Sequence, residues 1–198
     1  MKTAEIDPRV PVTEALPHRI TRRKFLHYSA LMAATLMVPN MARAAVNLDS
    51  QEERRLKLFN THTGERLATC YGRGDAYDSE ALKAINHILR DHRTNEIMPI
   101  DIRLLDLLCA IRKRAGRGTY LEIISGYRSP ATNRMLRRHS SGVARKSLHM
   151  KGYAADIRIS GMPLAQLRQI AVGLNRGGVG FYPSSDFVHV DIGRVRRW

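Results

Sequence analysis

Cysteine, acidic residues and long apolar runs are scarce in this sequence of 198 residues. Two cysteines are too few for the disulfide framework of a small secreted protein. No apolar stretch approaches the roughly 18 to 20 residues that a helix needs to cross a bilayer, which excludes a protein with several membrane spans. Glycine has no three-residue period and no heptads run along the chain, so collagen and long coiled coils are excluded as well. The length allows one or at most two domains.

The shortage of acidic residues gives the chain a large positive charge. Asp and Glu number 18 against 33 Lys and Arg, and the formal net charge is +15. Hydrophobic residues make up 43% and charged residues 26%, a balance typical of a folded soluble protein. A positive field of this strength favours an anionic partner, such as nucleic acid, anionic lipid or an acidic polymer of the cell wall.

The beginning of the chain has the three parts of an export signal. Arg22 and Arg23 precede large apolar residues, and a mildly apolar stretch follows at 29–38. Ala42 and Ala44 then supply the small residues that a signal peptidase recognises. The arginine pair resembles the twin-arginine export signal. The alternative interpretation is a short buried helix with a basic start.

We therefore predict that residues 1–44 are a twin-arginine-type signal peptide and that residues 45–198 form the mature protein in the periplasm. The mature part retains 26 Lys and Arg against 15 Asp and Glu, so its charge of +11 does not come from the signal. No lipid-anchoring cysteine follows the apolar stretch, and we expect no stable membrane insertion after cleavage. Cys109 falls in an apolar helical stripe, which favours a buried free thiol, and whether Cys70 pairs with it stays open.

The hydrophobic pattern of the mature chain predicts one α+β domain. Alternating apolar residues on both sides of 60–64 indicate an N-terminal hairpin or two short strands. Helical periodicity follows Ser79, which we interpret as a helix N-cap, and appears again after Asp101 and from Pro163. The other expected elements are a helix at 132–138 and strands at 120–124, 177–182 and 187–192, together with the segment 148–159, which contains a glycine and alternates after it. Because helices precede most of the short strands, the order favours α+β over a βαβ array.

Two histidines and two aspartates in the last third of the chain have spacings that suit a metal site. His149 and Asp156 would lie about 10.5 Å apart along a helix and on opposite faces of a strand. They can meet only if the chain folds back between them, for which Gly152 has the conformational freedom. His189 and Asp191 share one side of a strand. Two histidines and one carboxylate can hold zinc and leave a fourth position open for water.

A family resemblance strengthens this interpretation. Residues 147–156 match the S-x-H-x-x-G-x-A-x-D motif of the zinc D-Ala-D-Ala peptidases at every fixed position, and His189 follows at a compatible interval. Residues 125–129 resemble the segment of those enzymes that carries a substrate-binding arginine. The stretch 56–198 is similar to the exported murein endopeptidases of the MepK type. The resemblance implies a Hedgehog/DD-peptidase-like fold with a small antiparallel sheet and flanking helices, one zinc ion, and peptidoglycan cross-links as the substrate.

The resemblance also assigns roles to individual residues. It implies that His149, Asp156 and His189 are the zinc ligands. Arg128 would hold a substrate carboxylate or steady the oxyanion. Ser147 would donate to the substrate, or its hydroxyl would simply close a turn. Hydrolysis would use a water activated by zinc, with a carboxylate as general base.

Two aspartates are candidates for the general base. Asp186 lies three residues before His189, where many relatives have an acid, although strand parity would turn it away unless the strand begins after it. Asp191 shares the face of His189 and could reach the water at the metal, or it could instead orient a ligand from behind. The sequence leaves both open.

Three functions compete at this point. The first is a zinc endopeptidase that cuts peptidoglycan stem-peptide cross-links, and the second is a non-catalytic cell-wall-binding module of the same fold. The third is a nucleic-acid binder, which only the charge suggests, and export and the lack of any recognition motif argue against it. The sequence determines neither the oligomeric state nor the bond that is cut, D-Ala to diaminopimelate or diaminopimelate to diaminopimelate, although the resemblance favours the second.

Overall fold

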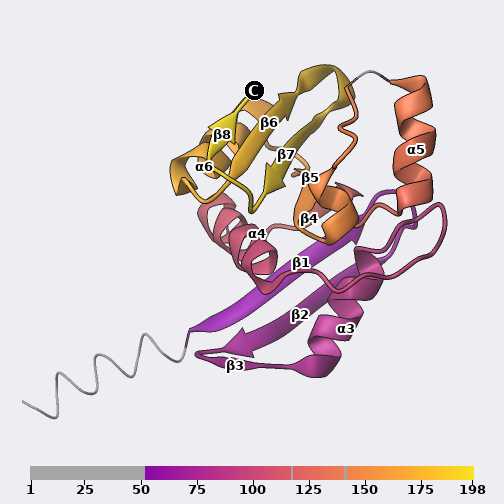
Figure 1. Cartoon of the computed structure of the whole chain (residues 1–198). Coiled ribbons are helices and arrows are strands. Elements are labelled where there is room, and N and C mark those ends of the chain that lie inside the picture. Colours follow the sequence, from indigo (N-terminus) through magenta and orange to yellow (C-terminus); the bar gives the residue numbers. More distant parts are fainter. Residues whose placement is uncertain (1–51, 117, 141) are drawn as a thin grey trace, which may run out of the picture. The chain divides into compact units, whose positions relative to one another are not determined.

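One eight-stranded sheet organises the part of the chain that the computed structural model describes, residues 52–116, 118–140 and 142–198 (Figure 1). The proposed signal at 1–44 lies outside the described residues. The strands are β1 Glu53–Asn60, β2 Arg66–Arg73, β3 Ala76–Tyr77, β4 Leu121–Ser125, β5 Ala154–Arg158, β6 Gly178–Tyr182, β7 Phe187–Asp191 and β8 Arg196–Arg197. Their order across the sheet is β3-β2-β1-β4-β5-β7-β6-β8.

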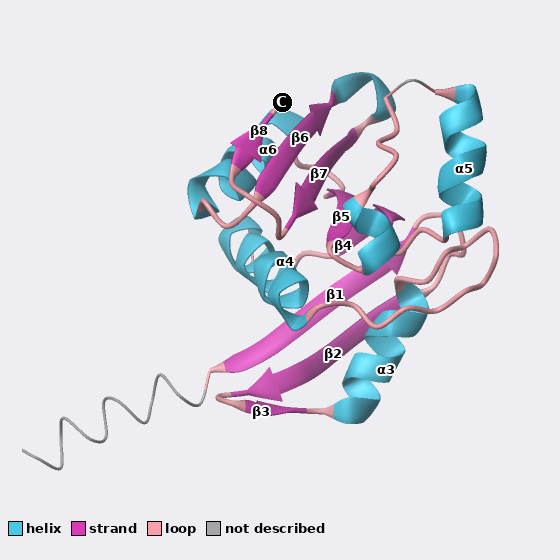
Figure 2. Ribbon diagram, in the orientation of Figure 1, coloured by secondary structure: helices cyan, strands magenta, loops and turns pink. Residues whose placement is uncertain are grey.

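In the described residues, four α-helices and two short 3₁₀ helices accompany the sheet. Figure 2 shows how they are arranged around it. They are α3 Ser79–Ile88, α4 Ile102–Ala115, α5 Pro130–His139, α6 Leu164–Leu174, η1 Leu148–Lys151 and η2 Pro183–Ser185. Of the described helices, none is both long and apolar enough to cross a membrane. Helices and strands occur in one unit, as the α+β prediction expected.

The sheet differs from the small antiparallel one that was expected. It is mixed, because β1 pairs with β4 in parallel and β6 pairs with β8 in parallel, whereas the other neighbours are antiparallel. The chain between β1 and β4 contains α3 and α4, and a connection of this length allows a strand to return in the same direction.

The ends of the helices follow from local side-chain chemistry. Asp101 caps α4, where the sequence placed the start of a helix, and Gly116 ends this helix with φ 122°. The cap of α3 is a correction: Asp78 accepts the backbone N–H groups of Glu80 and Ala81, and Ser79 is the first helical residue. Asp and Ser both suit the N-cap position, so the adjacent residues Asp78 and Ser79 made the start of α3 ambiguous in the sequence.

The hydrophobic core covers one face of the central strands. Because side chains alternate along a strand, every second residue points into this core and the residues between them point to the other face. The helices α3, α4 and α6 pack on the sheet and contribute to a continuous apolar cluster. Ile157 of β5 and Val188 of β7 pair across the two strands and are fully buried in this cluster. Asp156 and His189, which alternate with them, therefore project from the other face.

Both cysteines are free thiols. Cys109 is buried in α4, as its place in an apolar stripe predicted. The Sγ atom of Cys109 lies 3.5 Å from the carbonyl oxygen of Arg55, and Cys70 donates to the carbonyl of Gly72.

Candidate metal centre

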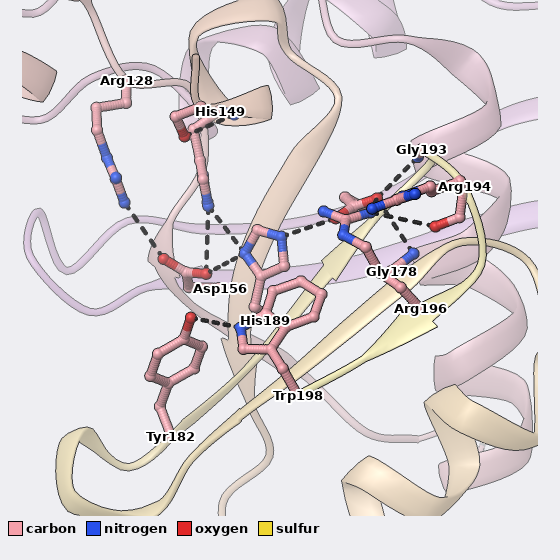
Figure 3. Close-up of polar contacts among 12 residues, drawn as sticks. Arg128, His149, Asp156, Gly178, Tyr182, His189, Gly193, Arg194, Arg196 and Trp198 are labelled. Carbon is pink, nitrogen blue, oxygen red and sulfur yellow. Dashed lines mark hydrogen bonds and ion pairs between the residues drawn. The ribbon is translucent and has the colours of Figure 1, made fainter. Parts of the chain in front are cut away.

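Three side chains from η1, β5 and β7 converge on the face of the sheet away from the core (Figure 3). One ligand atom from each of His149, Asp156 and His189 lies within 4.8 Å of the other two. Nδ1 of His189 is 3.1 Å from Nε2 of His149 and 2.9 Å from Oδ1 of Asp156. Nε2 of His149 is 3.3 Å from the same Oδ1. The fold thus brings together the three residues that the sequence proposed as zinc ligands.

A tight turn brings His149 next to Asp156. Gly152 ends η1 in the left-handed conformation, with φ 68°, and its N–H bonds back to the carbonyl of His149. A Cβ atom at this position would lie 2.6 Å from the carbonyl oxygen of Pro99. The chain therefore folds back at a residue where any side chain is both strained and crowded, which confirms the reversal that the spacing required.

Strand pairing places the other two side chains side by side. Asp156 of β5 lies directly opposite His189 of β7 in an antiparallel pair. Side chains at such opposed positions start from Cβ atoms about 4.5–5.5 Å apart. The sheet register, and not a flexible loop, therefore fixes the distance between the carboxylate and the imidazole.

Hydrogen bonds on the outer side of each imidazole orient the rings. Nδ1 of His149 lies 2.8 Å from the carbonyl oxygen of Gly126, an acceptor, so this nitrogen carries the proton. Nε2 of His189 lies 3.1 Å from Oδ2 of Asp191, a carboxylate oxygen that likewise accepts a hydrogen bond, so this nitrogen carries the proton of the neutral ring. In the neutral rings, the lone pairs of Nε2 of His149 and Nδ1 of His189 then face each other and the Asp156 carboxylate. Three electron-pair donors at this separation repel one another unless a cation lies among them.

The close approach of these side chains shifts the pKa values of Asp156 and His189. Burial opposes the ionised form of Asp156, but the two histidines outweigh burial and hold the pKa of Asp156 below its ordinary value. Burial likewise opposes protonation of His189, yet hydrogen bonds to Asp156 and Asp191 raise the pKa of His189. Both shifts show that the site favours a negative carboxylate beside a positive charge.

Asp191 lies behind His189, on the side away from the other two side chains. It is fully buried, and besides His189 it accepts hydrogen bonds from the N–H groups of Gly178 and Gly193 and from both terminal nitrogens of Arg196. Burial opposes its ionised form, but His189 and Arg196 outweigh burial and lower the pKa of Asp191. Of the two roles that the sequence left open for Asp191, this geometry supports the orienting one.

Asp186 lies outside the strand, so strand parity does not decide its direction. β7 begins at Phe187, and Asp186 has a left-handed conformation after η2, with φ 53°. Its side chain is 64% exposed and bonds to Nη1 of Arg158 at 2.8 Å. Arg158 also bonds to Glu122 through Nε. Asp186 is thus an accessible carboxylate that bonds to Arg158 and, within the described part of the chain, to none of the clustered side chains.

Arg128 points into the site from the segment between β4 and α5 (Figure 3). One terminal nitrogen lies 3.4 Å from Oδ2 of Asp156 and 3.4 Å from the hydroxyl of Ser125. The side chain is only 12% exposed, and its Nε has no hydrogen-bond partner among the described residues. Burial, partly offset by Asp156, lowers the pKa of Arg128 from its ordinary value. A buried guanidinium with unused donors is suited to bind an anionic group.

Ser147 has a local role in the turn. Its Oγ accepts the backbone N–H of His149 at 3.4 Å, and Ser147 is the N-cap of η1. The structure therefore supports the alternative in which this hydroxyl closes the turn.

Sequence reasoning missed Trp198, which forms an aromatic wall beside His189. The ring of Trp198 lies 5.4 Å from the ring of His189, and its Nε1 donates to the hydroxyl of Tyr182 at 2.7 Å (Figure 3). Gly180 is paired opposite His189, and a Cβ atom there would lie 2.7 Å from the Trp198 ring. A glycine in the middle of a strand often marks such a close approach, and this signal could have identified the wall.

Comparisons with known proteins agree with this geometry. The family model for the peptidoglycan L,D-endopeptidase MepK matches residues 48–198, which include the whole candidate metal centre. The chain is 41% identical over 177 residues to the peptidoglycan L,D-endopeptidase MepK of Escherichia coli K12, with 89% of this chain and 96% of the relative covered. The same values hold for the protein of that name from Shigella flexneri. A probable peptidoglycan L,D-endopeptidase MepK of Haemophilus influenzae is 39% identical over 178 residues, covering 89% and 95%.

Proposed function

The chain belongs to the family of the peptidoglycan L,D-endopeptidase MepK, and from this premise we propose that it is a zinc-dependent murein endopeptidase of the periplasm. The proposal includes a twin-arginine-type signal at 1–44 and a zinc peptidase domain of Hedgehog/DD-peptidase-like fold at 45–198. The family match over 48–198 and the paired arginines before an apolar stretch support these parts.

The observation that carries the metal proposal is the convergence of three electron-pair donors. The outer hydrogen bonds of His149 and His189 leave their inward nitrogens unprotonated in the neutral rings, beside the Asp156 carboxylate. Two imidazole nitrogens and one carboxylate oxygen are a ligand set of catalytic zinc sites, which keep a fourth position open. Bound zinc would lower the pKa of a water and polarise the scissile carbonyl group.

The protein residues divide the remaining work. Asp186, which is accessible to solvent, is the proposed general base: it takes a proton from the attacking water and delivers it to the departing amine. Arg128 holds a carboxylate of the substrate or the oxygen on which negative charge develops, through donors that the protein leaves unused. Asp191 keeps the His189 ring in one tautomer and one orientation.

The proposed substrate is the peptide cross-link of peptidoglycan. The printed names of the relatives specify an L,D-endopeptidase, and this favours the bond between two diaminopimelate residues over that between D-Ala and diaminopimelate. Stem peptides carry free carboxylates, which the positive charge of the chain would attract. A non-catalytic wall-binding module has less support, because the chain retains an accessible acid at the position of the base.

Digestion of purified cross-linked muropeptides tests this function directly. We expect about one zinc ion per chain, cleavage of the cross-link by the zinc-loaded protein, and loss of cleavage after chelation that added zinc restores. His149→Ala should abolish both zinc binding and turnover, because it removes one of three ligands. Mass identification of the products reveals the bond. Full cleavage by chelated, metal-free protein would disprove the mechanism, and binding to sacculi without any cleavage would favour the non-catalytic module.

A further inference from the structure

The segment that surrounds the candidate metal centre is strongly basic. Between Glu122 and Asp156 the chain has no Asp or Glu, whereas it has seven Lys and Arg. Arg128 is one of these and points into the site. The others lie on α5, on the loop that follows it and on η1.

Three of these arginines surround a cavity next to the metal centre. The cavity has a volume of about 410 Å³ and is lined by Pro130, Asn133, Arg134, Arg137, Arg145 and Met150. We call it the arginine pocket. Met150 directly follows His149, and Pro130 comes two residues after Arg128. The pocket therefore lies close to the backbone that carries these two residues of the site.

The fold holds the arginines in this arrangement. Arg134 and Arg137 are three residues apart on α5 and therefore neighbours on the helix surface. The Nδ2 group of buried Asn133 donates to the carbonyl of Ala144 at 3.2 Å, which fastens the loop before Arg145 to the helix. The three guanidinium groups thus come together although they belong to two segments.

No acidic side chain among the described residues neutralises the arginine pocket. Elsewhere in the described structure, Arg90, Arg158 and Arg196 each bond to a carboxylate. Arg134, Arg137 and Arg145 form no such ion pair within the described part of the chain, and like charges around one cavity repel one another. An anionic ligand would relieve this repulsion and could accept bidentate hydrogen bonds from the guanidinium groups.

We propose that the arginine pocket binds a free carboxylate of the peptidoglycan stem peptide and is a second anchor for the substrate beside Arg128. This inference rests on the proposed endopeptidase function. Phosphate has a similar affinity for guanidinium groups, but the pocket adjoins His149 and Arg128, so the anions nearest to it during cleavage are the carboxylates of the bound peptide.

The test compares two double variants that each remove two positive charges. Arg134→Ala with Arg137→Ala removes two of the three arginines of the arginine pocket. Arg114→Ala with Arg176→Ala is the matched control at a separate cavity that contains no residue of the site. Initial rates are measured on cross-linked muropeptides with free carboxyl groups and on the same muropeptides after amidation of those groups. Zinc content and thermal unfolding are measured for each protein.

We expect the pocket variant to raise KM for the free substrate about fivefold while kcat stays within about twofold. Because the lost charges favour a carboxylate over an amide, KM for the amidated substrate should change little, and the ratio of KM between amidated and free substrate should fall by about the same factor. Arg134→Lys with Arg137→Lys should restore part of the affinity, since the charge remains. The control variant should keep the wild-type ratio.

Three outcomes would overturn the inference. One is an unchanged KM ratio in the pocket variant, and another is an equal change in the control variant, which would indicate a general effect of net charge. The third is weaker competition by inorganic phosphate in the pocket variant with an unchanged KM for muropeptides, which would identify the pocket as a phosphate site. Failure of the wild-type protein to cut any muropeptide would instead refute the proposed function. Calorimetric titration with an uncrosslinked stem peptide would then still decide whether the pocket binds a carboxylate.

Discussion

Asp186 and Asp191 lie within three residues of His189, yet the chain gives the two carboxylates opposite surroundings. Asp191 is fully buried, and both of its oxygens already accept hydrogen bonds from His189, Arg196 or backbone N–H groups. Asp186 is 64% exposed and bonds to one arginine on the surface. A general base must be accessible to the attacking water and the substrate. A buried carboxylate whose oxygens already accept hydrogen bonds can only orient the groups that donate to it. Environment, and not residue type, therefore separates the two proposed roles.

Conservative amides should separate these roles experimentally. Asp186→Asn should lower kcat by about 10²- to 10⁴-fold with zinc content unchanged, because it removes a general base and keeps a residue that tolerates positive φ. Asp191→Asn should weaken zinc affinity by about 10- to 100-fold, because His189 loses its orienting partner. Zinc titration and initial rates at saturating zinc measure the two effects. If Asp191→Asn loses turnover at full zinc occupancy while Asp186→Asn stays active, the assignment is reversed.

Individual elements were predictable wherever local chemistry determines them. The alternation around 60–64 gives the β1–β2 hairpin, and Asp101 and Gly116 give the two ends of α4. The reversal at Gly152 followed from the spacing of His149 and Asp156 alone. Each of these depends on residues that are close together in the sequence.

Pairings between distant strands were not predictable from local patterns, whereas the joint role of His149, Asp156 and His189 came from the family resemblance. The parallel pairing of β1 with β4 joins Leu58 to Leu121 across two intervening helices. The contact between Trp198 and His189 needs β8 to pair with β6 at the edge of the sheet. Nothing in the local pattern of either segment specifies its partner, because pairing depends on the packing of the whole core.

Two glycines allow the turn between η1 and β5 to be tested with a matched control. Gly152 and Gly161 both have positive φ, 68° and 76°. A Cβ atom at Gly152 would lie 2.6 Å from the carbonyl oxygen of Pro99, whereas a Cβ atom at Gly161 would have no other atom within 4 Å. Gly161→Ala should cost about 1–2 kcal/mol of unfolding free energy from backbone strain alone. Gly152→Ala should cost more and also weaken zinc binding, since the overlap displaces the turn that holds His149. Denaturant unfolding and zinc titration measure both, and equal losses in the two variants with unchanged zinc affinity would refute this role of the turn.

At the scale of the whole molecule, contacts between distant segments support the frame around the site. Asp91 is buried and accepts the N–H groups of Arg93 and Ser129, which joins the loop after α3 to the start of α5. Beside it, the ring of His92 stacks on that of His62 at 3.8 Å. These contacts connect the β1–β2 turn, this loop and the segment that carries Arg128, so their protonation affects the stability of the folded chain as a whole.

The pKa shifts of this frame predict loss of stability in acid. Burial, with added repulsion from His62, lowers the pKa of His92 from its ordinary 6.5 to about 4. The unfolded chain therefore binds a proton at His92 before the folded chain does, and stability falls as the pH decreases from about 6.5 to about 4. Burial opposes the ionised form of Asp91, but hydrogen bonds from Thr132, Ser129 and Arg93 outweigh it and lower the pKa of Asp91 to about 2. Its contribution is present above about pH 4 and is lost towards pH 2.

Urea unfolding of the chelated protein at several pH values checks the part that depends on His92. Chelation removes the contribution of bound zinc, which would otherwise also change with pH. His92→Gln cannot take up the proton, so the fall in unfolding free energy between pH 6.5 and pH 4 should be smaller than in the wild type. His139→Gln, at the exposed end of α5, should keep the wild-type slope. If His92→Gln and His139→Gln lose stability equally across this range, then His92 does not couple folding to pH, and the acid sensitivity of the frame must come from its carboxylates.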